Sequence, residues 1–235
     1  MLALDLHTHT IASGHGTTDT ILDLAASASK KGLSILGITD HGPGTRASGT
    51  SSYFRSLYMA PKKRFGVHMM YGVELNILDT RGTFDLDEWT LSLLDYAIAS
   101  MHPQNFTSHG IEGNTKAYLC AMKNPHVRII GHCDDIKYPV DYQALVRGAM
   151  ENHVFLELNN ASLNPEGYRG DTRANNEEIL KYCRQYQYPV LLSSDSHGAH
   201  DVGSTTYIDE FLSHTDFPEE LILNRSISRF KHYWY

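Results

Sequence analysis

The stretch Leu2-Ala3-Leu4-Asp5-Leu6-His7-Thr8-His9 places a short apolar strand directly before two histidines. Alternate residues of an extended chain point to the same side, so His7 and His9 can bind one metal ion. Taken alone the pattern is a weak signal, because two histidines at a strand end also occur without a metal. The residues that follow the other predicted strands therefore decide its meaning.

The rest of the chain repeats this strand unit, with apolar, β-branched runs alternating with amphipathic stretches. Helices are predicted from a cap at Thr18 or Asp19 to Gly32, and over residues 114–123, 142–152 and 174–186. Segments 45–66 and 159–173 are polar and irregular, and are candidate loops over an active site. The pattern predicts one α/β domain over residues 1–235, as a closed barrel or an open sheet. The seven predicted strands begin near Leu2, Ser34, Val67, Leu94, Val127, Val154 and Pro189.

Potential metal ligands stand at or near the ends of six of these seven strands. The sixth gives Glu157-Leu158-Asn159-Asn160 and supplies none, whereas His15 lies in a glycine-rich segment close enough to reach the same face. In parallel α/β folds the carboxyl ends of all strands lie on one face, where binding sites are built. The candidate metal ligands are His7, His9, His15, His41, Glu74, His102, His132, Asp195 and His197.

Nine such ligands exceed the needs of one tetrahedral site, so two or three ions are expected. Mixed imidazole and carboxylate ligation suits zinc, manganese or iron better than calcium or copper. Clustered ions stabilise the attacking and leaving oxygens of a displacement at phosphorus, and they lower the pKa of bound water. The ligand pattern therefore predicts the hydrolysis of phosphate esters.

The composition of the chain restricts the classes of partner that it is expected to bind. The chain has 20 Lys and Arg against 27 Asp and Glu, a net charge of −7, which argues against nucleic acid and anionic membranes as partners. Its fourteen histidines favour metal chemistry. Three widely spaced cysteines suggest a reducing compartment, and we find no signal peptide or long apolar run. We expect a soluble, cytoplasmic protein.

Six motifs occur in an order that resembles the polymerase and histidinol phosphatase (PHP) family, above all its YcdX-like phosphatases. They are D-L-H-T-H-T, I-T-D-H-G-P, G-V-E-L-N, G-H-C-D-D-I-K-Y-P-V-D, E-L-N-N-A-S and S-S-D-S-H. The resemblance implies a distorted seven-stranded (β/α)7 TIM-like barrel and three divalent ions, with a metal-activated hydroxide attacking phosphorus. It assigns His7, His9, Glu74 and Asp195 to one ion, Glu74, His102 and His132 to a second, and His15, His41 and His197 to a third.

Other residues are weaker candidates for roles at this site. Arg169 corresponds roughly to a family arginine and is expected to bind the substrate phosphate as a catalytic residue, with Arg173 as a second candidate. Asp40 is a candidate for proton transfer. Cys133 is either an extra ligand or a packed thiol. Asn159 and Asn160 are expected to orient ligands, and the aromatic tail over 230–235 to form a packed or interface helix, which leaves a homo-oligomer open.

Several functions remain open at this point. The leading hypothesis is a phosphomonoesterase acting on a small phosphorylated substrate, with histidinol phosphate as one possibility. A nuclease or phosphodiesterase is the second, although the chain has no basic stripe. An amidohydrolase is a third, although many of those use a lysine bridge where this chain has Glu74. The last is a regulatory module that binds metal without turnover. Metal-dependent phosphate release separates the first from the rest.

Overall fold

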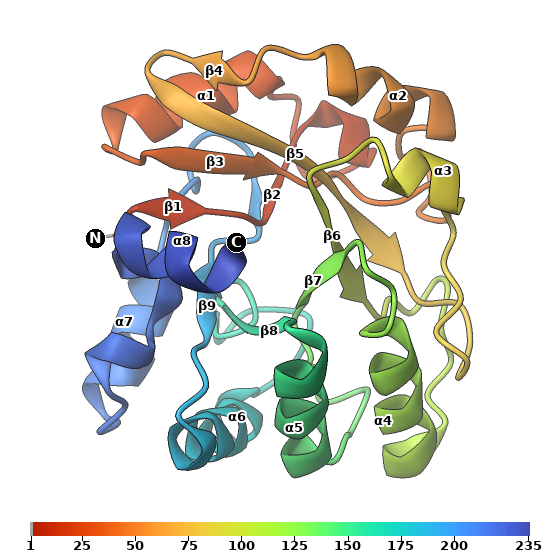
Figure 1. Ribbon diagram of the computed structural model, residues 1–235, viewed down its shortest axis with the longest axis vertical. Coiled ribbons are helices and arrows are strands. Elements are labelled where there is room, and N and C mark those ends of the chain that lie inside the picture. The colour runs from red at the N-terminus through yellow and green to blue at the C-terminus, as the bar shows by residue number, and fades with distance from the viewer. Residues whose placement is uncertain (1) are drawn as a thin grey trace.

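Seven parallel strands follow one another around a nearly closed barrel, which confirms the predicted α/β barrel (Figure 1). The computed structural model describes residues 2–235. Each strand pairs in parallel with the next, as where Leu4 lies opposite Ile35. In hydrogen-bonded order the strands are β1 (Leu4–Asp5), β3 (Ile35–Ile38), β5 (Val67–Asn76), β6 (Tyr96–Ser100), β7 (Val127–Ile130), β8 (Phe155–Asn159) and β9 (Leu191–Ser193).

Three short strands were not predicted. β2 (Thr8–His9) pairs in parallel with β10 (Ser196–His197), so that His9 lies opposite His197. β4 (Lys63–Arg64) runs antiparallel to the start of β5. The β2–β10 pair matters most for the site, because it joins the segments that follow the first and last barrel strands.

Two buried side chains bridge the seam between β1 and β9: Asp5, whose carboxylate accepts from the Ser194 amide at 3.3 Å and the Ser194 hydroxyl at 2.5 Å, and Asn224. Asn224 donates hydrogen bonds to the carbonyls of Leu4 at 3.0 Å and Leu192 at 2.6 Å, and it accepts one from the Leu192 amide at 3.0 Å. A side-chain amide can both donate and accept, so it substitutes here for a missing strand-to-strand ladder. The barrel is therefore completed in part by a residue more than thirty positions beyond its last strand.

The barrel interior holds its own apolar cluster, with at least one residue from every barrel strand. Tyr96 belongs to it, and its hydroxyl donates to the Leu6 carbonyl at 2.6 Å. A side chain at Gly37 would meet that hydroxyl at 2.0 Å, which is why only glycine fits there. Helix α8 (Ile227–Trp234) contributes buried Phe230 and Trp234 to the cluster, so the aromatic tail is a packed helix.

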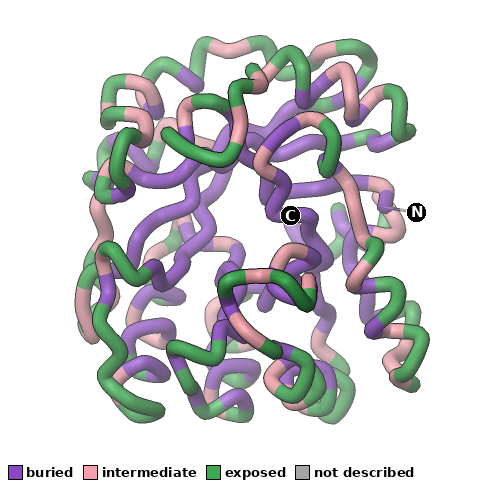
Figure 2. Tube along the Cα trace, turned by 180° about the vertical axis from the view of Figure 1, so that it is seen from behind, coloured by how far each residue is buried: buried purple, intermediate pink, exposed green. Residues whose placement is uncertain are grey.

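An outer layer of helices covers the barrel, and Figure 2 shows the buried strands surrounded by partly exposed helices. Helix α5 begins and ends where it was predicted, and α6 begins one residue early. Helix α4 begins four residues before its predicted start. The N-cap of α1 is Thr20, not Thr18 or Asp19, and its side chain accepts a hydrogen bond from the Asp23 amide. The helices are α1 (Ile21–Lys30), α2 (Ser51–Ser56), α3 (Glu88–Leu91), α4 (Gly110–Ala121), α5 (Tyr142–Asn152), α6 (Arg173–Tyr186), α7 (Thr206–Ser213) and α8, with short 3-10 helices at Ile11–Ser13, Leu57–Met59, Glu219–Leu221 and Leu223–Arg225.

The two segments that were predicted to be irregular, 45–66 and 159–173, differ from each other in the structure. Residues 160–172 contain no helix or strand, as predicted. The prediction for 45–66 was wrong in its second half, which forms α2, a 3-10 helix and β4. Phe54 and Leu57, both buried against the barrel, explain why this half is ordered.

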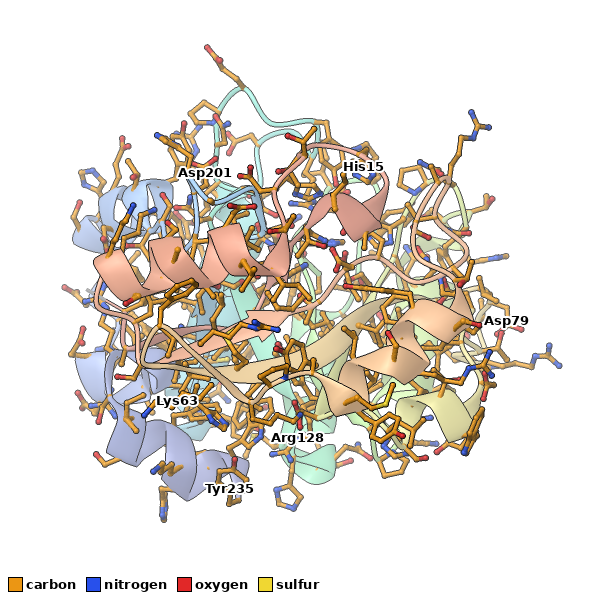
Figure 3. All side chains as sticks on the ribbon, turned by 90° about the horizontal axis from the view of Figure 1, so that it is seen from above. His15, Lys63, Asp79, Arg128, Asp201 and Tyr235 are labelled. Atoms are coloured by element: carbon orange, nitrogen blue, oxygen red, sulfur yellow. The ribbon has the colours of Figure 1, made fainter. Side chains whose placement is uncertain are left out.

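The two ends of the barrel have different characters. Figure 3 shows His15 at one end and Tyr235 with Arg128 at the other. The first is the carboxyl end of the strands, and the second carries the C-terminal helix. No helix within residues 2–235 combines the length and apolar character that a membrane crossing needs.

Candidate metal centre

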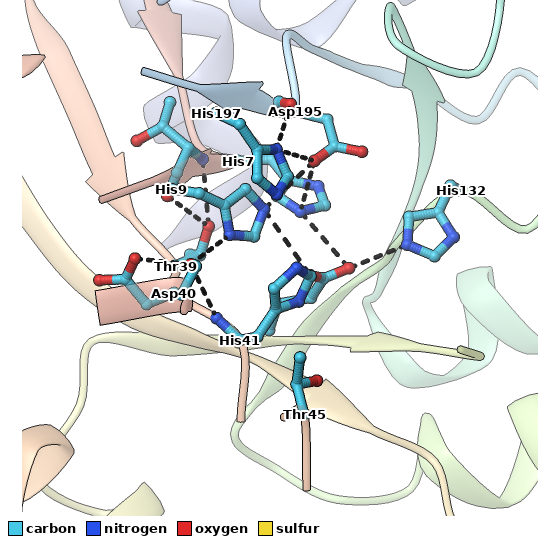
Figure 4. Close-up of polar contacts among 12 residues, drawn as sticks. His7, His9, Thr39, Asp40, His41, Thr45, His132, Asp195 and His197 are labelled. Carbon is cyan, nitrogen blue, oxygen red and sulfur yellow. Dashed lines mark hydrogen bonds and ion pairs between the residues drawn. The ribbon is translucent and has the colours of Figure 1, made fainter. Parts of the chain in front are cut away.

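All nine candidate ligands lie together at the carboxyl end of the barrel, where Figure 4 labels His7, His9, His41, His132, Asp195 and His197. Glu74, at the end of β5, is central to the group. Its carboxylate oxygens lie 2.6 Å from His41 Nδ1, 2.9 Å from His132 Nε2 and 3.2 Å from His102 Nε2. They also lie 3.5 Å from His7 Nε2 and 3.7 Å from His9 Nε2.

Asp195 forms a second centre on the opposite side of the same cluster. One of its carboxylate oxygens lies 3.2 Å from His9 Nε2, 3.6 Å from His7 Nε2 and 3.8 Å from His197 Nδ1. His15 is exposed at the mouth, with its ring centroid 4.9 Å from that of His41 and 5.1 Å from that of His197. The sequence therefore placed all nine side chains correctly at one site, and their role as ligands stays a prediction.

The unpaired atoms of this cluster fit a metal centre. Three overlapping groups have ligand atoms within 4.8 Å of one another: His9 with His41 and His197, His7 with His9 and Asp195, and His41 with Glu74 and His102. Buried polar atoms without a hydrogen-bond partner are rare in proteins, and each calls for a cause. Seven of the nine residues carry one: His7, His9, His41, Glu74, His102, His132 and His197. In His132 the unpaired atom is Nδ1, whereas Nε2 faces Glu74 at 2.9 Å.

Electrostatics at the cluster also suits cations. Burial raises the pKa of Glu74, but the surrounding imidazoles, His102 foremost, outweigh it and hold this pKa well below its usual value. Burial likewise raises the pKa of Asp195, and His7 with Arg169 lowers it by more. Burial lowers the pKa of His9, and neighbouring His197 lowers it further. The cluster thus presents ionised carboxylates beside a neutral imidazole, the forms in which these groups bind metals.

Three histidines of the cluster have one ring nitrogen fixed by a side chain outside the nine candidate ligands, which leaves the other nitrogen free for a cation. His7 Nδ1 lies 2.6 Å from Glu157 Oε1, and a carboxylate can only accept, so this nitrogen must carry the hydrogen. His9 Nδ1 lies 2.9 Å from Ser13 Oγ, whose own hydrogen goes to Asp40 at 2.7 Å. In both rings Nε2 is then the free nitrogen.

The third histidine is fixed through an amide. His102 Nδ1 lies 2.7 Å from Asn76 Oδ1. The orientation of that amide is set by Asp85, which accepts from Asn76 Nδ2 at 2.6 Å and from the Asn76 backbone amide at 3.0 Å. Asp85 also accepts from the Gly44 amide at 2.7 Å and so ties the following loop to the same network.

Glu157 is the residue that sequence reasoning missed. It lies in the middle of β8, not after it, and strand alternation points it into the barrel with Phe155 and Asn159. Its carboxylate accepts from the His132 backbone amide at 2.6 Å and from Asn159 Nδ2 at 2.8 Å, in addition to His7. A charged residue inside an apolar strand was the available signal. Asn159 also donates to Asp195 at 3.1 Å, whereas Asn160 caps α7 by accepting from the Tyr207 amide at 3.0 Å.

Two of the six non-glycine residues with a positive φ angle within residues 2–235 are candidate ligands. His132 and Asp195 have φ angles of 28° and 53°, in the left-handed region that favours glycine. Such strain persists where surrounding contacts enforce it, and it is found disproportionately at functional sites. Here the Glu157 bond to the His132 amide provides such a contact.

Of the two arginines predicted to bind phosphate, Arg169 lies at the cavity beside the cluster and Arg173 does not. Arg169 is buried and donates to Asp195 at 2.9 Å and to Ser162 at 3.2 Å. It lines a cavity of about 430 Å³ together with five of the candidate ligands. Burial lowers the pKa of Arg169, but Asp195 and other neighbours raise it by more, so the guanidinium stays charged. The structure does not bring Arg173 to this cavity, because its side chain is exposed and pairs with Asp171 at 2.6 Å.

Asp40 and Cys133 both lie buried. The Asp40 carboxylate accepts from Thr10, Ser13 and Tyr53, the last at 2.6 Å, and its contacts fit the positioning of Ser13 and His9. Proton transfer by Asp40 stays a prediction. Cys133 packs in a second, larger apolar cluster, which includes residues of the helices that cover the barrel. It is absent from the metal-ligand groups within residues 2–235. Burial raises the pKa of its thiol well above the usual value, which favours the packed role.

A parallel β/α barrel with an imidazole and carboxylate cluster at its carboxyl end defines a class, that of the metal-dependent hydrolases. The sequence model of the PHP domain matches residues 5–223. A probable phosphatase of Clostridium novyi is 41% identical over 221 residues, which cover 94% of this chain and 89% of the relative. The chain therefore belongs to the PHP domain family, and the predicted enzyme acting on phosphate esters is confirmed.

Solved structures share the fold. A Listeria monocytogenes protein, provisionally described as a histidinol phosphatase, has a TM-score of 0.62 at 19% identity, covering 88% of this chain and 99% of its own. The histidinol phosphate phosphatase of Lactococcus lactis, solved with zinc, L-histidinol and phosphate, has a TM-score of 0.58 at 14% identity. It covers 92% of this chain and 94% of that protein. At these identities the likeness concerns the barrel alone.

Proposed function

We propose that this chain hydrolyses small phosphomonoesters at a centre of three divalent ions, held by the nine side chains named above. The observation that carries the proposal is a set of buried atoms that make no hydrogen bond and belong to one cluster: a ring nitrogen of each of His7, His9, His41 and His102 and one carboxylate oxygen of Glu74. The zinc in the Lactococcus lactis protein supports a metal of this kind. Zinc, manganese and iron all suit the donor set.

The reaction takes a phosphate monoester and water to an alcohol and inorganic phosphate. A water oxygen forms a bond to phosphorus, the ester P–O bond breaks, and the departing oxygen takes a proton. Bound ions supply an activated water and stabilise the charge on the transferred group. The residues of the chain do the rest: Glu74 and Asp195 hold the positive charge in place, and Glu157 and Asp85 set the histidine orientations.

Arg169 is the residue best placed to bind the phosphate. It is charged, buried and part of the cavity wall, and its planar guanidinium suits phosphate oxygens. Its bonds to Asp195 and Ser162 hold the guanidinium against the cluster. The cavity of about 430 Å³ suits a small substrate. We retain this role for Arg169 and place Arg173 outside the site.

The test is to purify the protein without chelator, measure metal per chain, and assay p-nitrophenyl phosphate. We expect about three ions per chain, and a His7→Ala/His9→Ala variant that loses at least ~100-fold in activity. One ion or none, with no phosphate release after loading with manganese, zinc or iron, would overturn the proposal. Metal binding without turnover would favour the regulatory module instead.

A further inference from the structure

Apart from Arg169, the residues that line the cavity beside the candidate ligands are uncharged. The phosphate end of a substrate would face the cluster and Arg169, so the departing alcohol would meet the remaining wall. No carboxylate contributes to that remaining wall among the described residues that line the cavity. It consists of Gly16, Thr45, Pro103, Gln104, Ala161 and Tyr168.

The charges nearest to this wall are positive or already paired. Asp195 is the one lining carboxylate within residues 2–235, and it is bonded to Arg169 at 2.9 Å and lies 3.2 Å from His9 Nε2. At the mouth the ring of Tyr168 has the Lys137 ammonium 4.8 Å and the Arg169 guanidinium 4.9 Å from its centroid. Lys137 in turn lies 3.7 Å from the buried Asp135 carboxylate, so Asp135 and Asp195 each already face a cation and neither offers a cationic substrate group a free counterion.

We propose that the site selects phosphate esters of uncharged or anionic alcohols and discriminates against esters of amino alcohols, a preference that rests on the phosphatase function proposed above. An ammonium group placed against this wall would gain no partner charge there and would lie near the Lys137 and Arg169 cations, which is unfavourable. A hydroxyl in the same position carries no charge and needs no counterion. Histidinol phosphate, which carries an amine, is then a poor substrate despite the shared barrel.

The first experiment measures binding without turnover. The metal-loaded protein is titrated by calorimetry at pH 7 with 2-hydroxyethylphosphonate and with 2-aminoethylphosphonate, which differ only in the terminal group. We expect the hydroxyl compound to bind about tenfold more tightly, the size of effect that one unpaired group gives. Equal binding, or tighter binding of the amine, would overturn the inference.

The second experiment compares turnover of 2-hydroxyethyl phosphate with that of 2-aminoethyl phosphate. An ammonium group makes its alcohol a better leaving group, so intrinsic reactivity runs against the expected order and a hydroxyl preference must come from the protein. If neither ester nor p-nitrophenyl phosphate is hydrolysed, the proposed function fails, whereas a preference for the amino ester defeats only this inference.

A matched pair of variants tests the wall itself. Gln104→Glu adds a carboxylate beside the departing group and should reduce the hydroxyl-to-amine ratio about tenfold. Gln104→Met keeps the wall uncharged and should keep the ratio of the parent protein. A ratio that is unchanged in Gln104→Glu would show that the wall charge does not set the preference and would overturn the inference.

Discussion

The Glu157 carboxylate accepts hydrogen bonds from a ring nitrogen, a backbone amide, a side-chain amide and the Ser193 hydroxyl. All four partners donate, so a neutral amide in its place would turn a donor toward another donor. The partners include His7 and the strained His132, both candidate ligands. One buried side chain thus controls two members of the cluster without belonging to it.

Glu157→Gln should therefore weaken metal binding, by roughly 10–100-fold, as loss of an orienting partner does elsewhere. The measurement is metal retained per chain after dialysis against a graded series of chelator concentrations. Glu178→Gln, which removes only a surface ion pair with Lys181, is the control and should retain metal like the parent protein. Equal retention in the two variants would contradict a positioning role for Glu157.

Asp85 gives a second prediction at this scale. Asp85→Asn would turn an amide toward Asn76 Nδ2, and rotation of the Asn76 amide would then present a donor to His102 Nδ1. His102 would lose the orientation that leaves Nε2 free, and we expect about tenfold weaker retention of the ion it binds. Metal stoichiometry by mass spectrometry measures this. Asp79→Asn, at the surface beside Arg81, should leave the metal stoichiometry unchanged. An equal loss of metal in both variants would exclude an effect of Asp85 on His102 through Asn76.

At the scale of elements, the strands were predictable and the closure was not. Apolar runs at regular spacing located all seven barrel strands, and strand ends located the cluster, because both follow from local pattern. Glu157 was named near the end of the sixth predicted strand but was given no role, because the search was for metal ligands and not for carboxylates that orient them. The β1–β9 seam depends on Asn224, whose partners lie more than thirty and more than two hundred residues away.

Asn224→Ala should destabilise the barrel by about 3 kcal/mol, because it leaves the buried Leu4 and Leu192 carbonyls and the Leu192 amide unpaired. Urea unfolding followed by fluorescence measures the change. Gln143→Ala removes one exposed bond to Tyr186 and should cost less than about 0.5 kcal/mol. If the Asn224 variant were no less stable than the Gln143 variant, the seam would be closed by other contacts.

Across the whole molecule, the sequence indicated the end of the barrel that carries the site but not the shape of its cavity. Ligand positions follow from strand order, whereas the placement of Arg169 inside and Arg173 outside depends on an irregular loop over residues 160–172. Arg169 lies in this loop and Arg173 is the first residue of α6, so no regular spacing fixes their relative direction. The predicted barrel is confirmed and the nine side chains lie together, while their role as ligands stays a prediction and Arg173 lies outside the cavity.

Metal and fold stability are coupled through the imidazoles. Burial lowers the pKa of His9, His15 and His197, and neighbouring imidazoles lower the first two further. An unfolded histidine has a pKa of about 6.5, so below that pH the unfolded chain takes up protons that these three folded rings refuse. Their contribution to stability is therefore present above about pH 6.5 and lost as the pH falls toward their folded pKa values. His7 opposes this trend, since carboxylates raise its pKa despite burial.

Bound ions should strengthen the same dependence of stability on pH, because a metal needs neutral imidazoles and competes with protons for them. The melting temperature of the metal-loaded protein should exceed that of the chelator-treated protein by several degrees at about pH 8, and this difference should shrink toward zero at about pH 5.5. Differential scanning fluorimetry at both pH values makes the comparison. The His7→Ala/His9→Ala variant should show little difference at either pH. A difference that is constant with pH, or that grows as the pH falls, would mean that the stabilising ions are not held by this histidine cluster.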